Sequence, residues 1–335
     1  MDRKRVENVK EKTLKMFEER RGTAVSGEQL AAGLGVSRAA VWKAVESLRK
    51  EGYDIAATTN RGYTLSTDSD ILSAQGIVPF LDSGMFPNGG KNIFVYKELE
   101  STNETAKQKA FKGAAHGTVI LAEGQTGGKG RLGRSFFSPA GTGLYMSLII
   151  KPDFASGKSL LITTAASVAV CRAIKKTCGI DTQIKWVNDI LFEGRKVCGI
   201  LTEAISSFES GQIEAAIVGI GINCNTKIAD MPEEIRETAG TLPTAVLRNR
   251  LAAEIINEFM LILSSFSENS YPEYMDEYRR RSIVLRKDIN VYNGATGEYA
   301  EAKAIDISND GGLIVIYRDG RKETLNSGEI SIRVK

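Results

Sequence analysis

The pattern of apolar and polar positions divides the chain into four stretches. Residues 1–66 space their apolar positions as amphipathic helices and end in two short alternating runs, which predicts helices followed by a two-stranded ribbon. Residues 67–91 are a polar connector with one short helix expected near 71–81. Residues 92–283 mix β-branched runs with long helical patterns, and residues 284–335 hold short strands separated by Asn-Gly and Asp-Gly turns. The expected fold class is α+β, and the last stretch predicts a small β-barrel.

Both helices and strands are expected within residues 92–283. An apolar helix is predicted over 159–178, and β-branched runs broken by turn signals predict an antiparallel-rich sheet over 182–222. Amphipathic helices are expected over 247–266 and 271–281. We expect a mostly antiparallel sheet with its helices on one side.

The N-terminal stretch has the element order of a winged helix-turn-helix. Ser37 is expected to cap a helix over 38–50 that enters the DNA major groove with its N-terminus first. Ser37, Arg38 and Lys43 are the candidate DNA contacts, Arg61 on the wing is a candidate phosphate contact, and Trp42 is left open. Residues 1–67 hold thirteen Lys or Arg against nine Asp or Glu, which favours a nucleic acid partner. A protein-docking role remains an alternative.

Composition narrows the class of protein. The chain has 335 residues, of which 42% are hydrophobic and 25% charged, as expected for a globular protein of two or three domains. The longest apolar stretch, 160–171, is too short to cross a bilayer, and no secretory segment is recognised, so we expect a cytoplasmic protein without a membrane partner. Four cysteines without CxxC spacing and a single histidine argue against a structural zinc site and against disulfides.

The strongest chemical signal is a glycine-rich basic loop between two apolar strands, within residues 118–150. Five glycines lie between Gly124 and Gly133, together with the cations Lys129 and Arg131, and Arg134 follows. Glycines let backbone N–H groups approach an anion, and the clustered cations repel one another unless an anion lies between them. A GxGxxG match in the loop is rejected because no helix follows, and a Walker loop is one residue too short. A charged surface hairpin remains the alternative.

Five sequence blocks, in order along the chain, resemble the biotin–protein ligases. They are Ser101-Thr102-Asn103, the loop from Gln125 to Pro139, Lys185-Trp186-Val187-Asn188-Asp189, Arg195-Lys196-Val197-Cys198-Gly199, and Gly219-Ile220-Gly221-Ile222-Asn223. The resemblance covers the whole chain. It departs at three positions, where Lys129 replaces an arginine, Phe136 a frequent tryptophan and Val187 a proline. It implies a central ligase domain over 92–283, a winged-helix DNA-binding domain over 1–66 and an SH3-like C-terminal domain over 284–335.

The resemblance also implies roles for single residues. Biotin binding falls to Ser101, Thr102, Asn103, Gln125, Gly128, Lys129, Arg131, Lys196, Gly199 and Gly219. ATP binding falls to Arg131, Arg134, Phe136, Lys185, Asn188, Gly221 and Asn223. Arg131, Lys185 and Lys196 bring two anions together, and Asp189 is the candidate for orienting the acceptor amine.

The implied reaction joins biotin to ATP as an adenylate, with Mg²⁺ accompanying ATP and no metal held by the protein alone. The acceptor is a lysine of the biotin carboxyl carrier protein of acetyl-CoA carboxylase. The adenylate is expected to order two loops, 124–138 and 223–242, and to drive a homodimer onto operator DNA of biotin genes. Two alternatives remain open, a lipoate–protein ligase and a non-enzymatic repressor that only senses a ligand.

Overall fold

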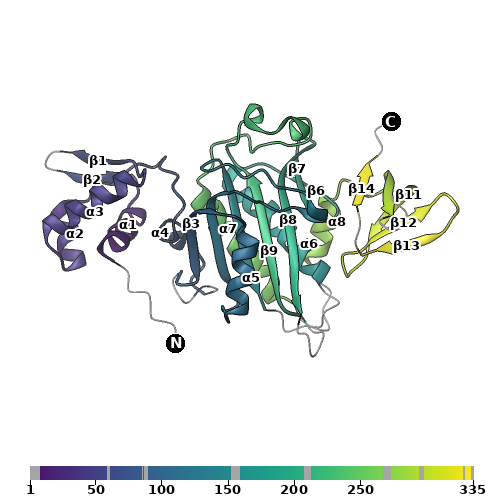
Figure 1. The fold of residues 1–335 in the computed structure, drawn as a ribbon, viewed down its shortest axis with the longest axis horizontal. Helices are drawn as coiled ribbons and strands as arrows, with labels where there is room; N and C mark the ends of the chain where they lie inside the picture. The colour runs from purple at the N-terminus through teal and green to yellow at the C-terminus, as the bar shows by residue number, and fades with distance from the viewer. Residues whose placement is uncertain are drawn as a thin grey trace.

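Three bodies follow one another along the chain (Figure 1). The computed structural model describes residues 8–58, 61–84, 86, 90–151, 159–206, 213–266, 273–293, 298–326 and 329–332. A helical unit with a two-stranded sheet comes first, a seven-stranded sheet with helices forms the middle, and a five-stranded sheet ends the chain. The outer two bodies lie at opposite ends of the central sheet, and the fold class is α+β, as predicted. Within the described ranges, no helix is long and apolar enough to cross a membrane.

The N-terminal unit is the predicted winged helix-turn-helix. Its elements are α1 Val9–Glu18, α2 Gly27–Leu34, α3 Arg38–Lys50, β1 Ile55–Thr58 and β2 Gly62–Leu65. Asn8 and Ser26 each form a capping box, and Ser37 Oγ accepts the N–H of Ala40 at the start of α3. These caps satisfy backbone N–H groups that a helix start leaves unpaired, so local sequence determines where each helix begins.

The connector contains the short helix α4 Ala74–Ile77 and the 3-10 turn η1 Val78–Phe80. Buried charge attaches it to the central sheet. Arg248 is only 2% exposed, and its guanidinium lies 2.7 Å from both Asp70 Oδ2 and Glu123 Oε2. Asn249 completes the joint, accepting the N–H of Ser73 and donating to the carbonyl of Ile71.

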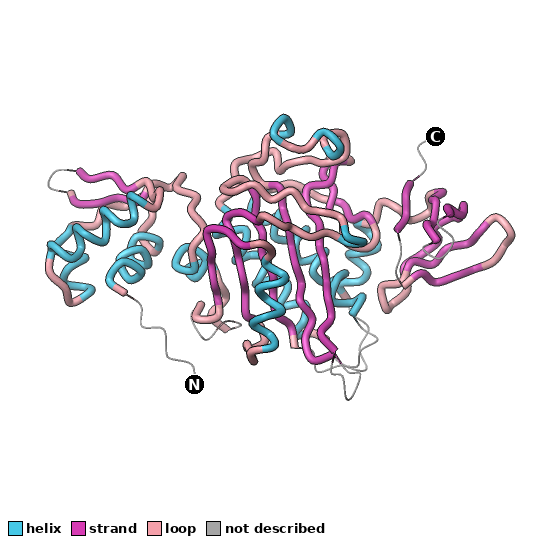
Figure 2. Tube along the Cα trace, in the orientation of Figure 1, coloured by secondary structure: helices cyan, strands magenta, loops and turns pink. Residues whose placement is uncertain are grey.

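The central sheet has the strand order β3-β4-β5-β9-β8-β7-β6. Figure 2 shows the strands of this sheet side by side. In this sheet only the β3–β4 pair is parallel and the other pairs are antiparallel, so the predicted antiparallel-rich sheet is confirmed. The strands are β3 Ile93–Leu99, β4 Thr118–Gln125, β5 Gly143–Ile150, β6 Gln183–Lys185, β7 Asp189–Phe192, β8 Arg195–Ser206 and β9 Ile213–Asn223.

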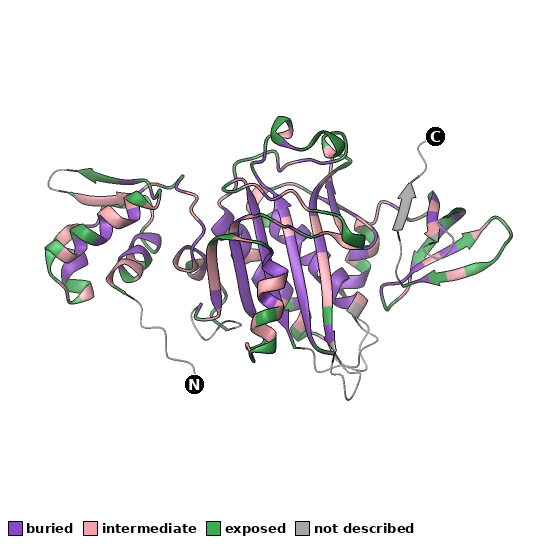
Figure 3. Cartoon of the chain, in the orientation of Figure 1, coloured by how far each residue is buried: buried purple, intermediate pink, exposed green. Residues whose placement is uncertain are grey.

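Helices cover both faces of this sheet, and the expectation of helices on one side was wrong. The helices α6 Ser159–Cys178, α7 Arg248–Ser264 and α8 Tyr274–Arg281 belong to the large core on one face (Figure 3). The helix α5 Thr102–Phe111 packs on β4, β5 and β9 from the other face. A helix was expected over residues 104–112, but not on this side of the sheet, because it has few apolar residues and contributes only the small side chains Ala106 and Ala110 to the core beneath it.

The C-terminal body is a small antiparallel sheet with the strand order β13-β12-β11-β10-β14. Its strands are β10 Asp288–Asn293, β11 Glu298–Ile307, β12 Leu313–Tyr317, β13 Lys322–Leu325 and β14 Glu329–Ile332. The predicted turns at Gly311 and Gly320 are present, and both glycines have a φ of +86° that favours glycine. The predicted Asn293-Gly294 turn extends outside the described residues.

Candidate active site

A strip of bare backbone runs across the middle of the central sheet on the face that α5 covers. In the strand pairing, Gly221 lies opposite Tyr145 and Gly199, and Gly219 lies opposite Ser147. Residues between them, such as Ile220, point to the other face and enter the large core. We call Gly199, Gly219 and Gly221 the glycine strip.

Other side chains already occupy the space above the glycine strip. A Cβ on Gly219 would lie 2.2 Å from Asn103 Oδ1, and a Cβ on Gly221 would lie 2.7 Å from the ring of Phe136. Both positions therefore require glycine, because Asn103 and Phe136 approach the backbone too closely for any other residue. The two glycines are two residues apart on one strand, which puts them on the same face of the sheet.

A neutral, hydrogen-bonded pocket floor lies beside the strip at the start of α5. Ser101 occupies the helix N-cap without making a side-chain cap hydrogen bond. The N–H and the hydroxyl of Thr102 lie 2.8 and 3.1 Å from Gln125 Oε1, and Gln125 Nε2 donates to Ser138 Oγ at 3.0 Å. These bonds fix the orientation of the Gln125 amide, so the floor presents set donors and acceptors to an uncharged ligand.

Two floor residues were missed by the sequence analysis. Ser147 Oγ lies 2.6 Å from Asn103 Oδ1 and 2.8 Å from Thr102 Oγ1, and its single proton can go to either. Glu203 accepts from Asn103 Nδ2 at 2.7 Å and so orients that amide. Ser147 carried a signal, because it is a polar residue in the middle of the otherwise apolar strand β5. Glu203 carried none.

The glycine-rich loop folds back on itself as a flap over the floor. The N–H of Gly130 donates to the carbonyl of Arg134 at 2.7 Å, and the N–H of Phe136 donates to the carbonyl of Gly128 at 2.8 Å. A Cβ on Gly128 would lie 2.4 Å from the carbonyl oxygen of Phe136, so this crossing needs glycine. Lys129 pairs with Glu104 of α5 at 2.7 Å rather than with a floor residue, and Arg134 is exposed.

The structure brings three of the predicted cations to one end of the sheet, beside the glycine strip. Arg131 donates to Asn188 Oδ1 at 3.1 Å, and the ammonium of Lys196 lies 2.7 Å from Asp189 Oδ1. Lys185 lies opposite Asp189 in the β6–β7 pairing, and Asp189 lies opposite Gly199 in the β7–β8 pairing. The grouping of three cations gives this end of the sheet a positive potential that suits an anionic ligand.

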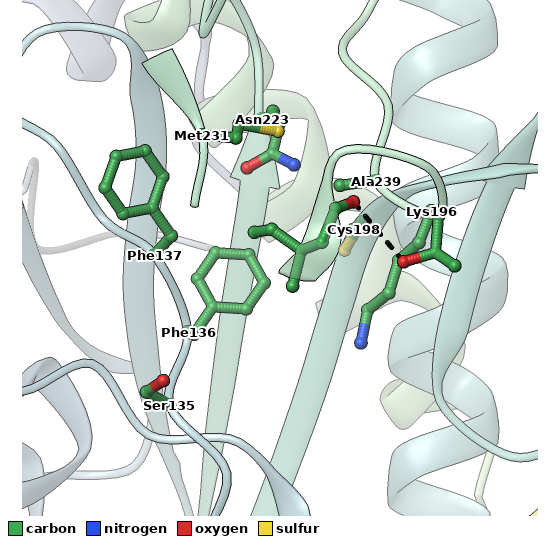
Figure 4. Close-up of a pocket in the computed structure, with 10 residues that line it drawn as sticks. Ser135, Phe136, Phe137, Lys196, Cys198, Asn223, Met231 and Ala239 are labelled. Carbon is green, nitrogen blue, oxygen red and sulfur yellow. Dashed lines mark hydrogen bonds between the residues drawn. The ribbon is translucent and has the colours of Figure 1, made fainter. Parts of the chain in front are cut away.

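A pocket opens between the flap and the segment that follows β9 (Figure 4). Phe136 comes from the flap side and Lys196 from β8, with Asn223 at the end of β9 and the apolar Met231 and Ile235 on the following segment. Backbone pairing holds that segment on β8, because the N–H of Lys196 donates to Thr238 and the N–H of Gly240 donates to Lys196, both at 2.8 Å. An aromatic ring and apolar side chains beside a lysine suit a flat base linked to a phosphate.

The buried thiols of Cys198 and Cys224 have raised pKa values. Burial raises the pKa of Cys198, which lines the pocket, well above its ordinary value, and it also raises the pKa of Cys224. These thiols remain protonated and are poor nucleophiles. Nor do the described residues contain a group of three or more His, Cys, Asp or Glu that could hold a metal ion.

The predicted DNA contacts are all exposed on the winged unit. Ser37, Arg38 and Lys43 are exposed at the N-terminal half of α3, and Arg61 is exposed at the start of the second wing strand. Trp42 is 54% exposed on the same helix. An exposed helix with cations at its N-terminal half has the geometry of a recognition helix.

Comparison with known proteins identifies three regions of the chain. Residues 9–64 match the HTH domain, residues 95–223 match the biotin/lipoate A/B protein ligase family, and residues 293–333 match the biotin protein ligase C terminal domain. The bifunctional ligase/repressor BirA of Bacillus subtilis is 34% identical over 316 residues, covering 92% of this chain and 94% of the relative. BirA of Escherichia coli is 27% identical over 311 residues, covering 92% of each.

This chain belongs to the biotin–protein ligase family. Among solved structures, the Aquifex aeolicus biotin protein ligase in complex with biotin and ATP is similar with a TM-score of 0.61 and 29% identity, covering 73% of this chain and 100% of that one. Because the similarity to the bifunctional relatives spans nearly the whole chain, this ligase has the organisation of a bifunctional ligase/repressor.

Proposed function

We propose that this ligase activates biotin with ATP to biotinyl-5′-AMP and then transfers biotin to a lysine of a carrier protein. The observation that carries the proposal is the junction of two unlike half-sites along the glycine strip. One is the neutral, hydrogen-bonded floor around Thr102 and Gln125, and the other is the cation group around Arg131 and Lys196. An uncharged ring attached to a carboxylate fits the first half, and a nucleotide triphosphate fits the second.

In the first step the biotin carboxylate attacks the α-phosphorus of ATP, a P–O bond forms, and pyrophosphate leaves. Arg131 and Lys196 neutralise the carboxylate and the α-phosphate, while Lys185 and Arg134 serve the leaving phosphates. Phe136 provides the platform for adenine, and Asn188 and Asn223 flank the nucleotide. Ser101, Thr102, Asn103, Gln125 and Lys129 hold the biotin side, with Gly128, Gly199, Gly219 and Gly221 allowing close approach. Mg²⁺ accompanies ATP and shields its phosphates.

In the second step the acceptor amine attacks the carbonyl of the mixed anhydride, and AMP leaves. Asp189 orients that amine, and the two loops 124–138 and 223–242 close over the adenylate to exclude water. The position of the pocket between these two segments supports the closure, since Phe136 and Met231 line it from opposite segments. Protease cleavage between Lys129 and Arg134 that is unchanged by biotin plus ATP would contradict it.

Exchange of labelled pyrophosphate into ATP tests the first step and separates the alternatives. We expect exchange with biotin and none with lipoate or without an acid. Exchange that requires lipoate would make the protein a lipoate–protein ligase. Absence of exchange with either acid, despite binding of biotin, would make it a ligand-sensing repressor without enzymatic activity.

We further propose that the adenylate drives a homodimer whose two winged units bind a palindromic operator of biotin genes. The exposed cations of α3 support DNA as the partner. Duplexes selected from a random pool with biotin and ATP present should lose about tenfold in affinity when Arg38 is replaced by alanine. The matched control is Lys50→Ala, which removes an exposed cation from the other end of the same helix. Sedimentation velocity that detects no mass increase with biotin and ATP would overturn the dimer.

The domain boundaries and the acceptor protein are proposed from the same family resemblance. The chain divides at residues 66, 91 and 283 into a winged unit, a connector, a ligase domain and an SH3-like C-terminal domain, as the three matched regions support. The acceptor is the biotin carboxyl carrier protein of acetyl-CoA carboxylase. Mass spectrometry of that carrier after incubation with biotin and ATP should detect one added biotin on a single lysine.

A further inference from the structure

The C-terminal sheet contacts the site through one buried tryptophan. Trp186 is the second residue of the segment from Lys185 to Asp189, and it is 4% exposed. Its Nε1 donates to the carbonyl of Gly311 at 2.9 Å, on the turn that joins β11 to β12. The contact spans 125 residues of sequence and joins a site segment to a sheet that supplies no proposed ligand contact.

The turn that accepts this hydrogen bond is closely fitted to the central body. Gly311 has a φ of +86°, and a Cβ on it would lie 3.2 Å from side-chain carbons of Leu160 and Thr164 in α6. Within the turn, the N–H of Ser308 donates to Gly312 at 2.7 Å and the N–H of Gly311 donates to Ser308 at 2.9 Å. The carbonyl of Gly311 therefore has a fixed position relative to α6.

Helix α8 forms hydrogen bonds both to the segment that contains Trp186 and to the turn that contains Gly311. The hydroxyl of Tyr278 donates to the carbonyl of Val187 at 3.0 Å, next to Trp186. The neighbouring Arg279 donates to the carbonyl of Ile307 at 2.9 and 2.7 Å, at the start of the turn. Two adjacent residues of one helix thus hold the site segment and the turn together.

We infer that the Ser308–Gly312 turn positions the cation half of the site, with Trp186 and Gly311 as positioning residues. The residues after Trp186 and Val187 carry the partners of the cations, because Asn188 binds Arg131 and Asp189 binds Lys196. A shift of this segment moves those partners and with them the cations. The neutral floor lies on β4, β5 and α5, in the other half of the sheet. The turn therefore affects the use of ATP more strongly than the binding of biotin, because the neutral floor holds the biotin ring and only its carboxylate meets Arg131 and Lys196.

Two glycines of the C-terminal sheet provide a matched test. Gly311 and Gly320 both have a φ of +86°, so alanine strains the backbone equally at each. Only at Gly311 does the new Cβ meet α6, since nothing lies within 4 Å of the Cβ position at Gly320. The comparison isolates the contact with the central body from the strain of the turn itself.

The inference rests on the proposed ligase reaction and is tested by biotin-dependent pyrophosphate exchange together with calorimetric binding of biotin alone. We expect Gly311→Ala to raise the KM for ATP about tenfold by misplacing the segment, with a rise in the Kd for biotin of about twofold or less, because the neutral floor holds the biotin ring. Gly320→Ala should stay within about twofold of the unmodified protein, since it alters no contact with the central body. Trp186→Phe, which removes the N–H while keeping an aromatic ring, should raise the KM for ATP about two- to tenfold.

The outcomes separate the inference from the proposed function. Equal KM values for ATP in Gly311→Ala and Gly320→Ala, or a Kd for biotin that weakens in parallel with the KM for ATP, would overturn the positioning role. If Gly311→Ala does not fold, Trp186→Phe decides the question, and an unchanged KM for ATP in that variant also overturns it. Absence of exchange in the unmodified protein overturns the ligase reaction instead.

Discussion

Two clusters of charge on the central sheet differ in how deeply their cations are buried. Arg248, at the joint between the connector and β4, is almost fully buried and binds two carboxylates and two carbonyl groups. Arg131 and Lys196, at the far end of the sheet, are partly exposed, and the structure pairs them with Asn188 and Asp189. The first cluster has a cation that is closed to solvent, and the second has cations that an anionic substrate can reach.

The difference separates charges that hold the fold from charges that act on ligands. A buried ion cluster costs desolvation, and removal of one member leaves the others unpaired in a poor solvent. A partly exposed cation loses little stability when it is removed, but its field disappears from the site. Stability measurements should therefore detect the Arg248 cluster, and activity measurements should detect the Lys196 cluster.

The largest effect is expected for Arg248→Met. The replacement leaves the half-buried carboxylates of Asp70 and Glu123 without their cation and should lower the free energy of unfolding by about 3–5 kcal/mol, measured by urea titration. Arg172→Met is the control, because Arg172 also binds two carboxylates, Glu258 and Glu277, but is far more exposed. Its loss should be about 1 kcal/mol or less. If both variants lose the same free energy of unfolding, burial does not make the Arg248 cluster more important for stability than the Arg172 cluster.

Lys196→Met should have the next largest effect, and on activity alone. Removing a fixed cation from the reacting anions should slow biotin-dependent pyrophosphate exchange by about 10²- to 10³-fold. The midpoint of urea unfolding should stay close to that of the unmodified protein. Lys175→Met is matched to it, since Lys175 also binds one aspartate, Asp181, at 2.7 Å but lies at the end of α6. If both lysine variants retain full exchange, Lys196 has no role in the reaction.

The neutral half of the site should respond to volume rather than charge. Gly219→Ala places a Cβ where Asn103 Oδ1 now lies, so it should displace that amide and weaken biotin binding about tenfold. The KM for ATP should remain unchanged. In Gly219→Ala/Asn103→Ala the clash is absent, so the loss of affinity should be smaller than the sum of the two single losses. Strict additivity in calorimetry would show that the two residues do not interact.

The sequence predicted the parts of the site that lie in contiguous blocks. The strand–loop–strand around Arg131 follows from the pattern of apolar residues and glycines, and the glycines at 219 and 221 follow from the family resemblance. Caps at Ser26 and Ser37 predicted where two helices begin, since a cap is a local hydrogen bond.

The sequence could not predict contacts between residues that lie far apart in the chain. Arg248 is one cation in an amphipathic helix, and nothing near it in the chain indicates partners at Asp70 and Glu123. Trp186 was recognised only as part of a motif, and Gly311 only as a turn residue, because their hydrogen bond exists only after the C-terminal sheet meets α6 and α8. Tertiary packing, rather than local propensity, assigns these residues their function.

The smallest effect is expected for the ion pair that attaches the flap to α5. Lys129 and Lys107 both donate to Glu104, and these hydrogen bonds lower the pKa of Glu104 below its ordinary value. A carboxyl group with a lowered pKa in the folded protein contributes stability that is present above its ordinary pKa and is lost as the pH falls through the lowered one. The attachment is thus complete at neutral pH.

In Glu104→Gln the amides of residues 126–134 should exchange hydrogen about two- to fivefold faster than in the unmodified protein at neutral pH, as expected for an exposed ion pair. The two proteins should converge as the pH falls through the lowered pKa of Glu104, after correction for intrinsic exchange. Amides of the 223–242 segment provide the internal reference, because Glu104 does not pair with that segment among the described residues. A difference between the proteins that persists in acid would mean that Glu104 stabilises the flap by packing rather than by charge. In that case the flap, unlike the cation cluster beside it, would not depend on charge pairing in the absence of ligand.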